Sequence, residues 1–272
     1  MHRMIFFIGV IILSIDNFQA QEYYWELENE YYQEQISSWD VNPLGEVIIY
    51  NKRNLQKLDA NFKLEFTQSV SSFGFISKID AKHSLKTLLF SENQQMVGFV
   101  DNTLTFQEGK QDLANLDIGY AYHVCYSDNS NRFWVYDEQN SRLIRFQGVQ
   151  SFTKQAEITN LAAITGESEL PKRIIENANQ LLVFYQGSGV FLFDYYGSLI
   201  RKIEAKEATQ VYPFGDYIYL LIDNKLKRIH QRLGEELVTE LPTKEAIDIR
   251  ITENKLFILN NKGIYKYSLK VH

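Results

Sequence analysis

The chain has 272 residues, four prolines, one cysteine, 17 Tyr, 18 Phe and a formal net charge of −6. The acidic balance argues against a nucleic acid partner, because phosphate contacts need clusters of Lys and Arg. A single cysteine excludes an internal disulfide, and the aromatic content favours strands.

The first twenty residues have the pattern of a secretory signal peptide. His2 and Arg3 precede an apolar run over residues 4–13, and Ala20 offers a small residue at the exit. This run is too short to span a bilayer, which needs about 20 apolar residues. We therefore expect a signal peptide over 1–20, a single mature domain over 21–272 and no transmembrane segment after cleavage. A retained anchor is the alternative.

The mature chain also lacks Asn-x-Ser/Thr acceptor sites for glycans. An exported chain with neither disulfides nor glycan sites fits a bacterial envelope better than an animal extracellular setting. We therefore predict a periplasmic or outer-membrane-associated protein. The lone Cys125, among apolar and aromatic neighbours, is predicted to be a small buried core residue, with a reactive thiol as the alternative.

The segment 21–40 concentrates acidic and aromatic residues. It holds six acids and no Lys or Arg. An aromatic strip within an acidic surround could dock a basic protein partner. Alternatively, the aromatic side chains pack on the rest of the fold and the acids face water. The candidate partner-binding residues are Tyr23, Tyr24, Trp25, Tyr31 and Tyr32.

A short apolar phrase returns six times along the chain. Its copies are Val47–Tyr50, Val97–Val100, Phe133–Tyr136, Leu182–Tyr185, Tyr219–Ile222 and Leu256–Leu259. The average spacing of about 42 residues, with several strands in each unit, is typical of a β-propeller. We predict an all-β fold with six blades of four short antiparallel strands.

The fourth unit shows the blade pattern best. Strands are predicted at 173–176, 180–185, 190–193 and 198–203. In the last turn, Asp194 can accept backbone N–H groups and Gly197 supplies a positive φ. In the corresponding turn of the first unit, Asn61 stands where the glycine is expected, and Asn also tolerates the left-handed region.

The phrase Val190–Leu199 resembles the strand–Asp-x-x-Gly–strand hairpin of six-bladed propellers of the NHL and YncE-like kind. The resemblance implies the fold, in a group that includes protein- and ligand-binding modules and some metal-dependent hydrolases and lyases. The Ala20-Gln21 exit resembles that of secreted envelope proteins from Bacteroidetes-type bacteria.

Two intervals between units are long, with surplus residues near 69–82 and 159–171. These are predicted to be longer connections, either functional insertions or tolerated surface loops. The last unit ends soon after its third strand, at His272. Because an unpaired strand edge is costly, we predict that the N-terminal segment, within Tyr23–Val41, completes the last blade and closes the ring.

Polar and aromatic residues on the predicted inner strands are candidates for the central channel. They are Trp39, Asp40, His123, Glu176, Tyr212 and Asp248. Carboxylates and His from several strands could converge on a divalent ion, but no His-x-His or related ligand spacing supports this. Trp39 and Tyr212 could instead stack on a small carbohydrate.

No nucleophile elbow, phosphate-binding loop or dinucleotide fingerprint occurs in the chain. The leading hypothesis is a non-enzymatic, exported propeller that acts as a protein-binding scaffold or accessory subunit in the cell envelope, with no metal and no cofactor. The alternative is a metal-dependent hydrolase or lyase, or a small-ligand binder, that uses the central channel.

Overall fold

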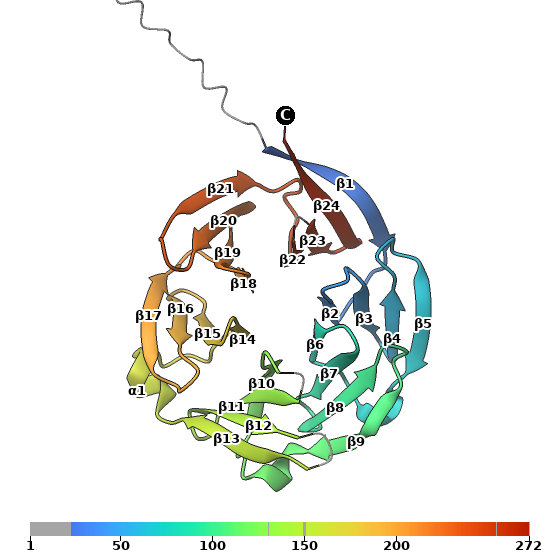
Figure 1. The fold of residues 1–272 in the computed structure, drawn as a ribbon. Helices are drawn as coiled ribbons and strands as arrows, with labels where there is room; N and C mark the ends of the chain where they lie inside the picture. Colours follow the sequence, from blue (N-terminus) through green and yellow to red (C-terminus); the bar gives the residue numbers. More distant parts are fainter. Residues whose placement is uncertain (1–22, 130, 149–150, 254, 272) are drawn as a thin grey trace, which may run out of the picture.

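The computed structural model describes residues 23–271 except 130, 149–150 and 254, and the predicted signal peptide lies outside this part. In the described part, the strands form six antiparallel sheets of four, arranged around a central opening (Figure 1). The prediction of a six-bladed β-propeller is confirmed. The innermost strands of neighbouring blades contact one another all around the ring.

Each of the first three blades runs from an inner to an outer strand in chain order. Blade 1 contains β2 (Ser38–Val41), β3 (Val47–Asn51), β4 (Asn54–Leu58) and β5 (Leu64–Ser69). Blade 2 contains β6 (Lys78–His83), β7 (Lys86–Ser91), β8 (Met96–Asp101) and β9 (Phe106–Asp112). Blade 3 contains β10 (Ala121–Tyr126), β11 (Arg132–Asp137), β12 (Arg142–Gln147) and β13 (Thr153–Ile158).

Blades 4 and 5 follow the same rule, whereas blade 6 takes its outermost strand from the N-terminus. Blade 4 contains β14 (Arg173–Asn177), β15 (Gln180–Tyr185), β16 (Gly189–Phe193) and β17 (Leu199–Glu204). Blade 5 contains β18 (Gln210–Phe214), β19 (Tyr217–Ile222), β20 (Lys225–His230) and β21 (Glu236–Glu240). Blade 6 contains β22 (Asp248–Thr252), β23 (Lys255–Asn260), β24 (Gly263–Val271) and β1 (Tyr23–Tyr32).

The ring closes where β1 pairs with β24. The register runs from Tyr23 opposite Val271 to Tyr32 opposite Gly263, with one irregularity between Leu27 and Asn29. Figure 1 shows β1 in blue beside β24 in dark red, near the marked C-terminus. The predicted closure by the N-terminal segment is confirmed, and it removes the unpaired edge that the last blade would otherwise expose.

The core consists of six apolar clusters, and each lies between two neighbouring blades. One cluster, for example, joins Leu182 and Phe184 of blade 4 to Val211 and Ile218 of blade 5. The middle strands of a blade are therefore buried on both faces. Strands in that position are near-continuous apolar runs rather than alternating ones, which explains the repeated phrases in the sequence.

One of these phrases occupies a different place from the others. Val97–Val100 lies in β8, the third strand of blade 2, whereas the other five lie in the second strands of their blades. The second strand of blade 2 is β7, an apolar run that is not among the six repeated segments. The surplus expected near residues 69–82 came from comparing unlike strands. Most of β6 lies in this stretch, and the connection between β5 and β6 carries the short 3-10 helix η1 (Ser71–Phe73).

Turns between third and outermost strands share one geometry in blades 1, 2 and 4. In each, an Asp Oδ1 accepts two backbone N–H groups, as Asp59 does from Asn61 at 2.9 Å and Lys63 at 2.8 Å. The residue with positive φ is Phe62 at +65°, Leu104 at +65° and Gly197 at +92°. The expectation for Asn61 was wrong: the left-handed position is Phe62, whose buried ring packs beside Phe257.

Besides η1, two further connections in the described part of the chain contain helical turns. The stretch between β13 and β14 was predicted as a longer connection, and it carries the short helix α1 (Leu161–Thr165), whose Leu161 is buried in the core. Between β9 and β10 lies the 3-10 helix η2 (Leu113–Leu116). No helix in the described residues is long and apolar enough to cross a membrane.

Candidate functional site: the central channel and the outer rim

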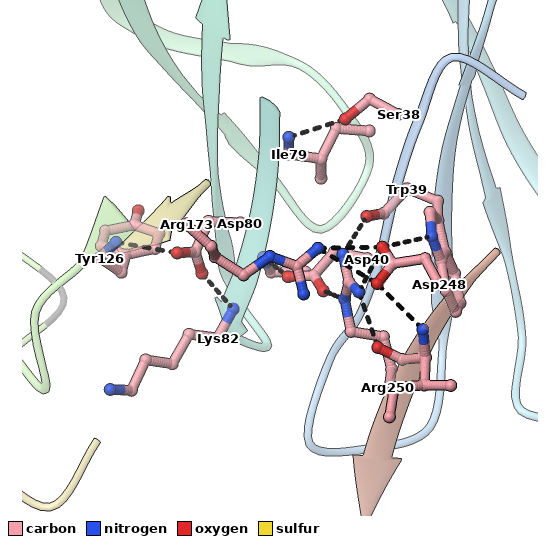
Figure 2. Close-up of polar contacts among 12 residues, drawn as sticks. Ser38, Trp39, Asp40, Ile79, Asp80, Lys82, Tyr126, Arg173, Asp248 and Arg250 are labelled. Atoms are coloured by element: carbon pink, nitrogen blue, oxygen red, sulfur yellow. Dashed lines mark hydrogen bonds and ion pairs between the residues drawn. The ribbon is translucent and has the colours of Figure 1, made fainter. Parts of the chain in front are cut away.

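The six predicted channel residues all belong to innermost strands. Trp39 and Asp40 lie in β2, His123 in β10, Glu176 in β14, Tyr212 in β18 and Asp248 in β22. Because the innermost strands surround the opening in Figure 1, five of the six blades contribute to one central region. Figure 2 shows that Asp40 and Asp248 meet there, beside Trp39.

Two cavities open along this central region. The larger has a volume of about 330 Å³ and is lined by innermost strands of every blade except blade 3, with Asp40, Glu176 and Tyr212 in its wall. The smaller, of about 200 Å³, is lined by His123 and its neighbours in blade 3. Lys78 and Arg173 line both cavities and therefore lie between them.

The guanidinium group of Arg250 ties blades 1 and 6 together. Its Nε donates to Asp40 Oδ1, its Nη1 donates to Asp248 Oδ2 at 2.7 Å, and its Nη2 donates to the Trp39 carbonyl at 3.1 Å. It also lies over the Trp39 ring, 4.7 Å from the centroid. Charge-assisted contacts of this kind are among the stronger polar interactions in a protein.

Asp248 is the most heavily engaged carboxylate of the channel. Arg173 reaches across from blade 4 to its Oδ2 at 3.0 Å, and Trp39 Nε1 donates to the same oxygen at 3.2 Å (Figure 2). Burial alone would raise the pKa of Asp248, but Arg173 and Arg250 outweigh it and hold this pKa well below its ordinary value. The carboxylate is therefore charged at neutral pH.

Other inner carboxylates join neighbouring blades through backbone N–H groups. Asp40 Oδ2 accepts from Ala81 N at 2.7 Å, which links blades 1 and 2. Asp80 Oδ2 accepts from Tyr126 N at 2.9 Å, which links blades 2 and 3 (Figure 2). These oxygens satisfy buried donors, so their first role is to hold the inner strands together.

Glu176 performs the same task between blades 3 and 4. Its Oε1 accepts from Ser127 Oγ at 2.7 Å and from Asp128 N at 2.9 Å, and its Oε2 accepts from Trp134 Nε1. The side chain is buried, and both oxygens are already engaged. In the described part of the chain, no three His, Cys, Asp or Glu side chains gather in a way that could hold a metal ion.

His123 and Cys125 belong to the wall of blade 3. The Nε2 of His123 lies 2.7 Å from the Pro171 carbonyl and donates to it. Burial, with Lys78 and Arg173 nearby, lowers the pKa of His123 from 6.5 to about 4, so the ring is neutral at pH 7. Cys125 is buried, as predicted, and burial raises the pKa of its thiol well above the ordinary value.

The inner strands also carry cations that the sequence analysis did not single out: Lys78, Arg173 and Arg250. The pattern that could have found Lys78 and Arg250 is alternation. In Lys78–Lys82 and in Asp248–Thr252, charged or polar residues alternate with Ile or Ala. Such alternation in an innermost strand points one set of side chains to the channel and the other set into the core.

The aromatic strip of β1 divides between core and surface. Trp25 and Tyr31 pack against the apolar clusters of the last blade, whereas Tyr24 is 43% exposed and Tyr32 64% exposed. The side chain of Tyr23 lies outside the described part. Two of the acids pair with lysines of blade 6, Glu26 with Lys270 and Glu28 with Lys255 and Lys266. The strip is therefore less acidic, as a surface, than its sequence suggests.

A groove lies on the outer rim beside the same strand. It has a volume of about 450 Å³ and lies between β1 and β21, the outermost strands of blades 6 and 5. Tyr24, Trp25 and Pro242 line it together with Leu237 and Val238, which are 40% and 55% exposed. Exposed apolar residues that gather around a hollow mark a surface suited to contact with another molecule.

Comparison with known proteins supports the fold alone. No family model and no curated protein matches the sequence. Among solved structures, a streptogramin B lyase is 13% identical with a TM-score of 0.60, over 91% of this chain and 98% of its own. A catalytically inactive virginiamycin B lyase from Staphylococcus aureus with quinupristin is 12% identical with a TM-score of 0.63, over 92% and 100%.

A structural genomics protein of unknown function from Bacteroides thetaiotaomicron is 13% identical with a TM-score of 0.64, over 92% of this chain and 77% of its own. At such low identity, shared architecture does not carry activity from one protein to another. The function of this chain must be argued from its own residues.

Proposed function

We propose that the protein is a non-enzymatic, exported propeller that acts as a protein-binding scaffold or accessory subunit in the cell envelope. The observation that carries this proposal is the apolar groove between β1 and β21. It exposes Tyr24, Leu237 and Val238 on a scaffold that packed cores between all six blades make rigid.

The proposed occupant is an extended apolar segment of another envelope protein. Among the described residues, the strand β21 pairs with β20 alone, so its other edge offers backbone donors and acceptors to an added strand. Its two acids already pair with β20, Glu236 with Lys227 and Glu240 with Lys225. The groove therefore favours apolar contact over recognition of a strongly basic partner. The basic partner that the sequence analysis offered as one alternative is therefore not part of this proposal.

The catalytic alternative has less support. A hydrolase or lyase that uses a divalent ion needs carboxylate or imidazole ligands with free lone pairs. Asp40, Glu176 and Asp248 instead accept hydrogen bonds at both of their oxygens. To bind a metal, these groups would have to leave contacts that join the blades.

Co-purification from envelope extract tests the proposal. Val238→Glu places a charge in the groove, and Ile200→Glu is the matched control, because Ile200 is 48% exposed on β17, the outermost strand of blade 4. We expect a discrete partner with the wild type and with Ile200→Glu, and its loss with Val238→Glu. Equal recovery with both variants would refute the groove as the interface.

Export is a separate part of the proposal. We expect the protein isolated from the envelope to begin at Gln21, which N-terminal sequencing determines directly. A protein that retains residues 1–20 would support the anchor instead.

A further inference from the structure

Lys78 is the exception among the cationic side chains of the channel. It starts β6, the innermost strand of blade 2, and lines both central cavities. Arg173, Arg250 and Lys82 each donate to a carboxylate, but the Lys78 ammonium group has no hydrogen-bond or ion-pair partner among the described residues. A half-buried ammonium without a partner is costly unless something else supplies an acceptor.

The charges around Lys78 favour an anion as that acceptor. Burial, followed by repulsion from Arg173 and Arg250, lowers the pKa of Lys78. Asp40 and Asp80 lie near enough to act in the opposite direction, but Asp40 is paired with Arg250, and Asp80 accepts from backbone N–H groups. A bound anion would stabilise the charged form of Lys78 without breaking these contacts.

The rest of the larger cavity is suited to an apolar group. Pro43, Ile175 and Phe214 are among the residues that line it. Tyr212 also lines this space, and its hydroxyl makes no hydrogen bond to another described residue. A volume of about 330 Å³ is at the lower end of the range for ligand pockets, roughly 300–1,000 Å³.

We propose that the central cavity binds a small amphiphilic carboxylate, with its carboxylate group on the Lys78 ammonium and the Tyr212 hydroxyl and its apolar body against Phe214 and Ile175. One negative charge matches the Lys78 ammonium, which has no partner among the described residues. A phosphate dianion would bring a second charge close to Asp40 and Asp80. This site is independent of the groove on the rim, so it stands or falls separately from the proposed function.

Calorimetric titration of the mature protein with three probes tests the site. The probes are 3-phenylpropionate, the uncharged 3-phenylpropanamide of the same shape, and inorganic phosphate. We expect the carboxylate to bind and the amide to bind at least ~10-fold more weakly, because the amide lacks the negative charge that strengthens a hydrogen bond to the ammonium. Phosphate should also bind at least ~10-fold more weakly, because it has no apolar body and brings a second negative charge close to Asp40 and Asp80. Binding of all three with equal strength, or of none at millimolar concentration, would overturn the proposal.

Variants identify the residue responsible. Lys78→Met should weaken binding of 3-phenylpropionate ~10-fold or more, and Tyr212→Phe should weaken it to a smaller degree. Lys244→Met is the control, because Lys244 is exposed and lies outside the cavity. Since the Lys78 ammonium has no partner to lose, Lys78→Met should melt at the wild-type temperature or above it. A lower melting temperature, or unchanged affinity, would show that Lys78 has a structural role instead.

Discussion

At the scale of single residues, the channel is held together by carboxylates that accept hydrogen bonds from the next blade. Asp40, Asp80 and Glu176 each reach a backbone N–H group of a neighbouring blade. A buried donor without an acceptor is strongly unfavourable. The free-energy cost of losing one of these contacts is therefore larger than the net stabilisation that the hydrogen bond itself provides.

Glu176→Gln tests this role. All three groups that face the two oxygens of Glu176 are donors, so an amide nitrogen would leave at least one donor unsatisfied. We expect a loss of about 2–4 kcal/mol in the free energy of unfolding, measured in urea. Glu204→Gln, at an exposed pair with Lys202, should change it by less than about 0.5 kcal/mol. A similar small change at Glu176 would contradict the account.

His123 predicts how stability depends on pH. Its pKa is lowered from 6.5 to about 4 by burial, with Lys78 and Arg173 opposing its charge. The unfolded chain therefore binds this proton first as pH falls, and stability is lost between pH 6.5 and 4, by up to about 3 kcal/mol. His123→Gln should flatten the pH dependence in this window, as followed by urea unfolding. An unchanged profile would mean that His123 is accessible to solvent and can become charged in the folded state.

At the scale of elements, the sequence predicts strands best where burial is two-sided. Second strands such as Leu182–Tyr185 are visible because both faces pack against neighbouring blades. The same property made Val97–Val100 in β8 resemble them, since a buried third strand has the same composition. Outermost strands such as β21 are largely exposed and leave a weaker pattern.

Positions that depend on distant contacts were harder to predict. Asn61 was the natural choice for positive φ, yet Phe62 takes it because its ring packs beside Phe257, nearly 200 positions away in the chain. The inner carboxylates could be predicted as channel residues because they lie on predicted inner strands. Their partner Arg250 could not be predicted from its pairing with Asp40, because no local sequence pattern relates the two residues.

Gly263 tests ring closure at the level of one hairpin. It has a φ of +152° opposite Tyr32, and an added Cβ would lie 2.0 Å from the Tyr31 carbonyl oxygen. Gly187 at φ +84° has nothing within 4 Å, so Gly187→Ala should cost only backbone strain, about 1–2 kcal/mol. We expect Gly263→Ala to cost clearly more and to expose β1 to protease. Equal losses in thermal melts would contradict the closure geometry.

At the scale of the whole molecule, the two chain ends complement each other. The N-terminal segment is acidic, and the strands beside it in blade 6 carry the lysines that pair with it, Lys255, Lys266 and Lys270. Some of the acidic residues that the sequence suggested for contact with an external partner thus pair with these lysines and help to close the ring. The surfaces that we propose for recognition are the apolar groove on the rim and the central cavity, where Lys78 has no partner among the described residues.

The central claim is that this propeller works by binding a protein at the groove between β1 and β21. Site-specific photo-crosslinking in intact cells tests it most directly, with a photoreactive phenylalanine at position 238 and, as the control, at position 200. The account predicts one discrete crosslinked product from position 238 and none from position 200. No product at position 238, or the same products from both positions, would contradict it.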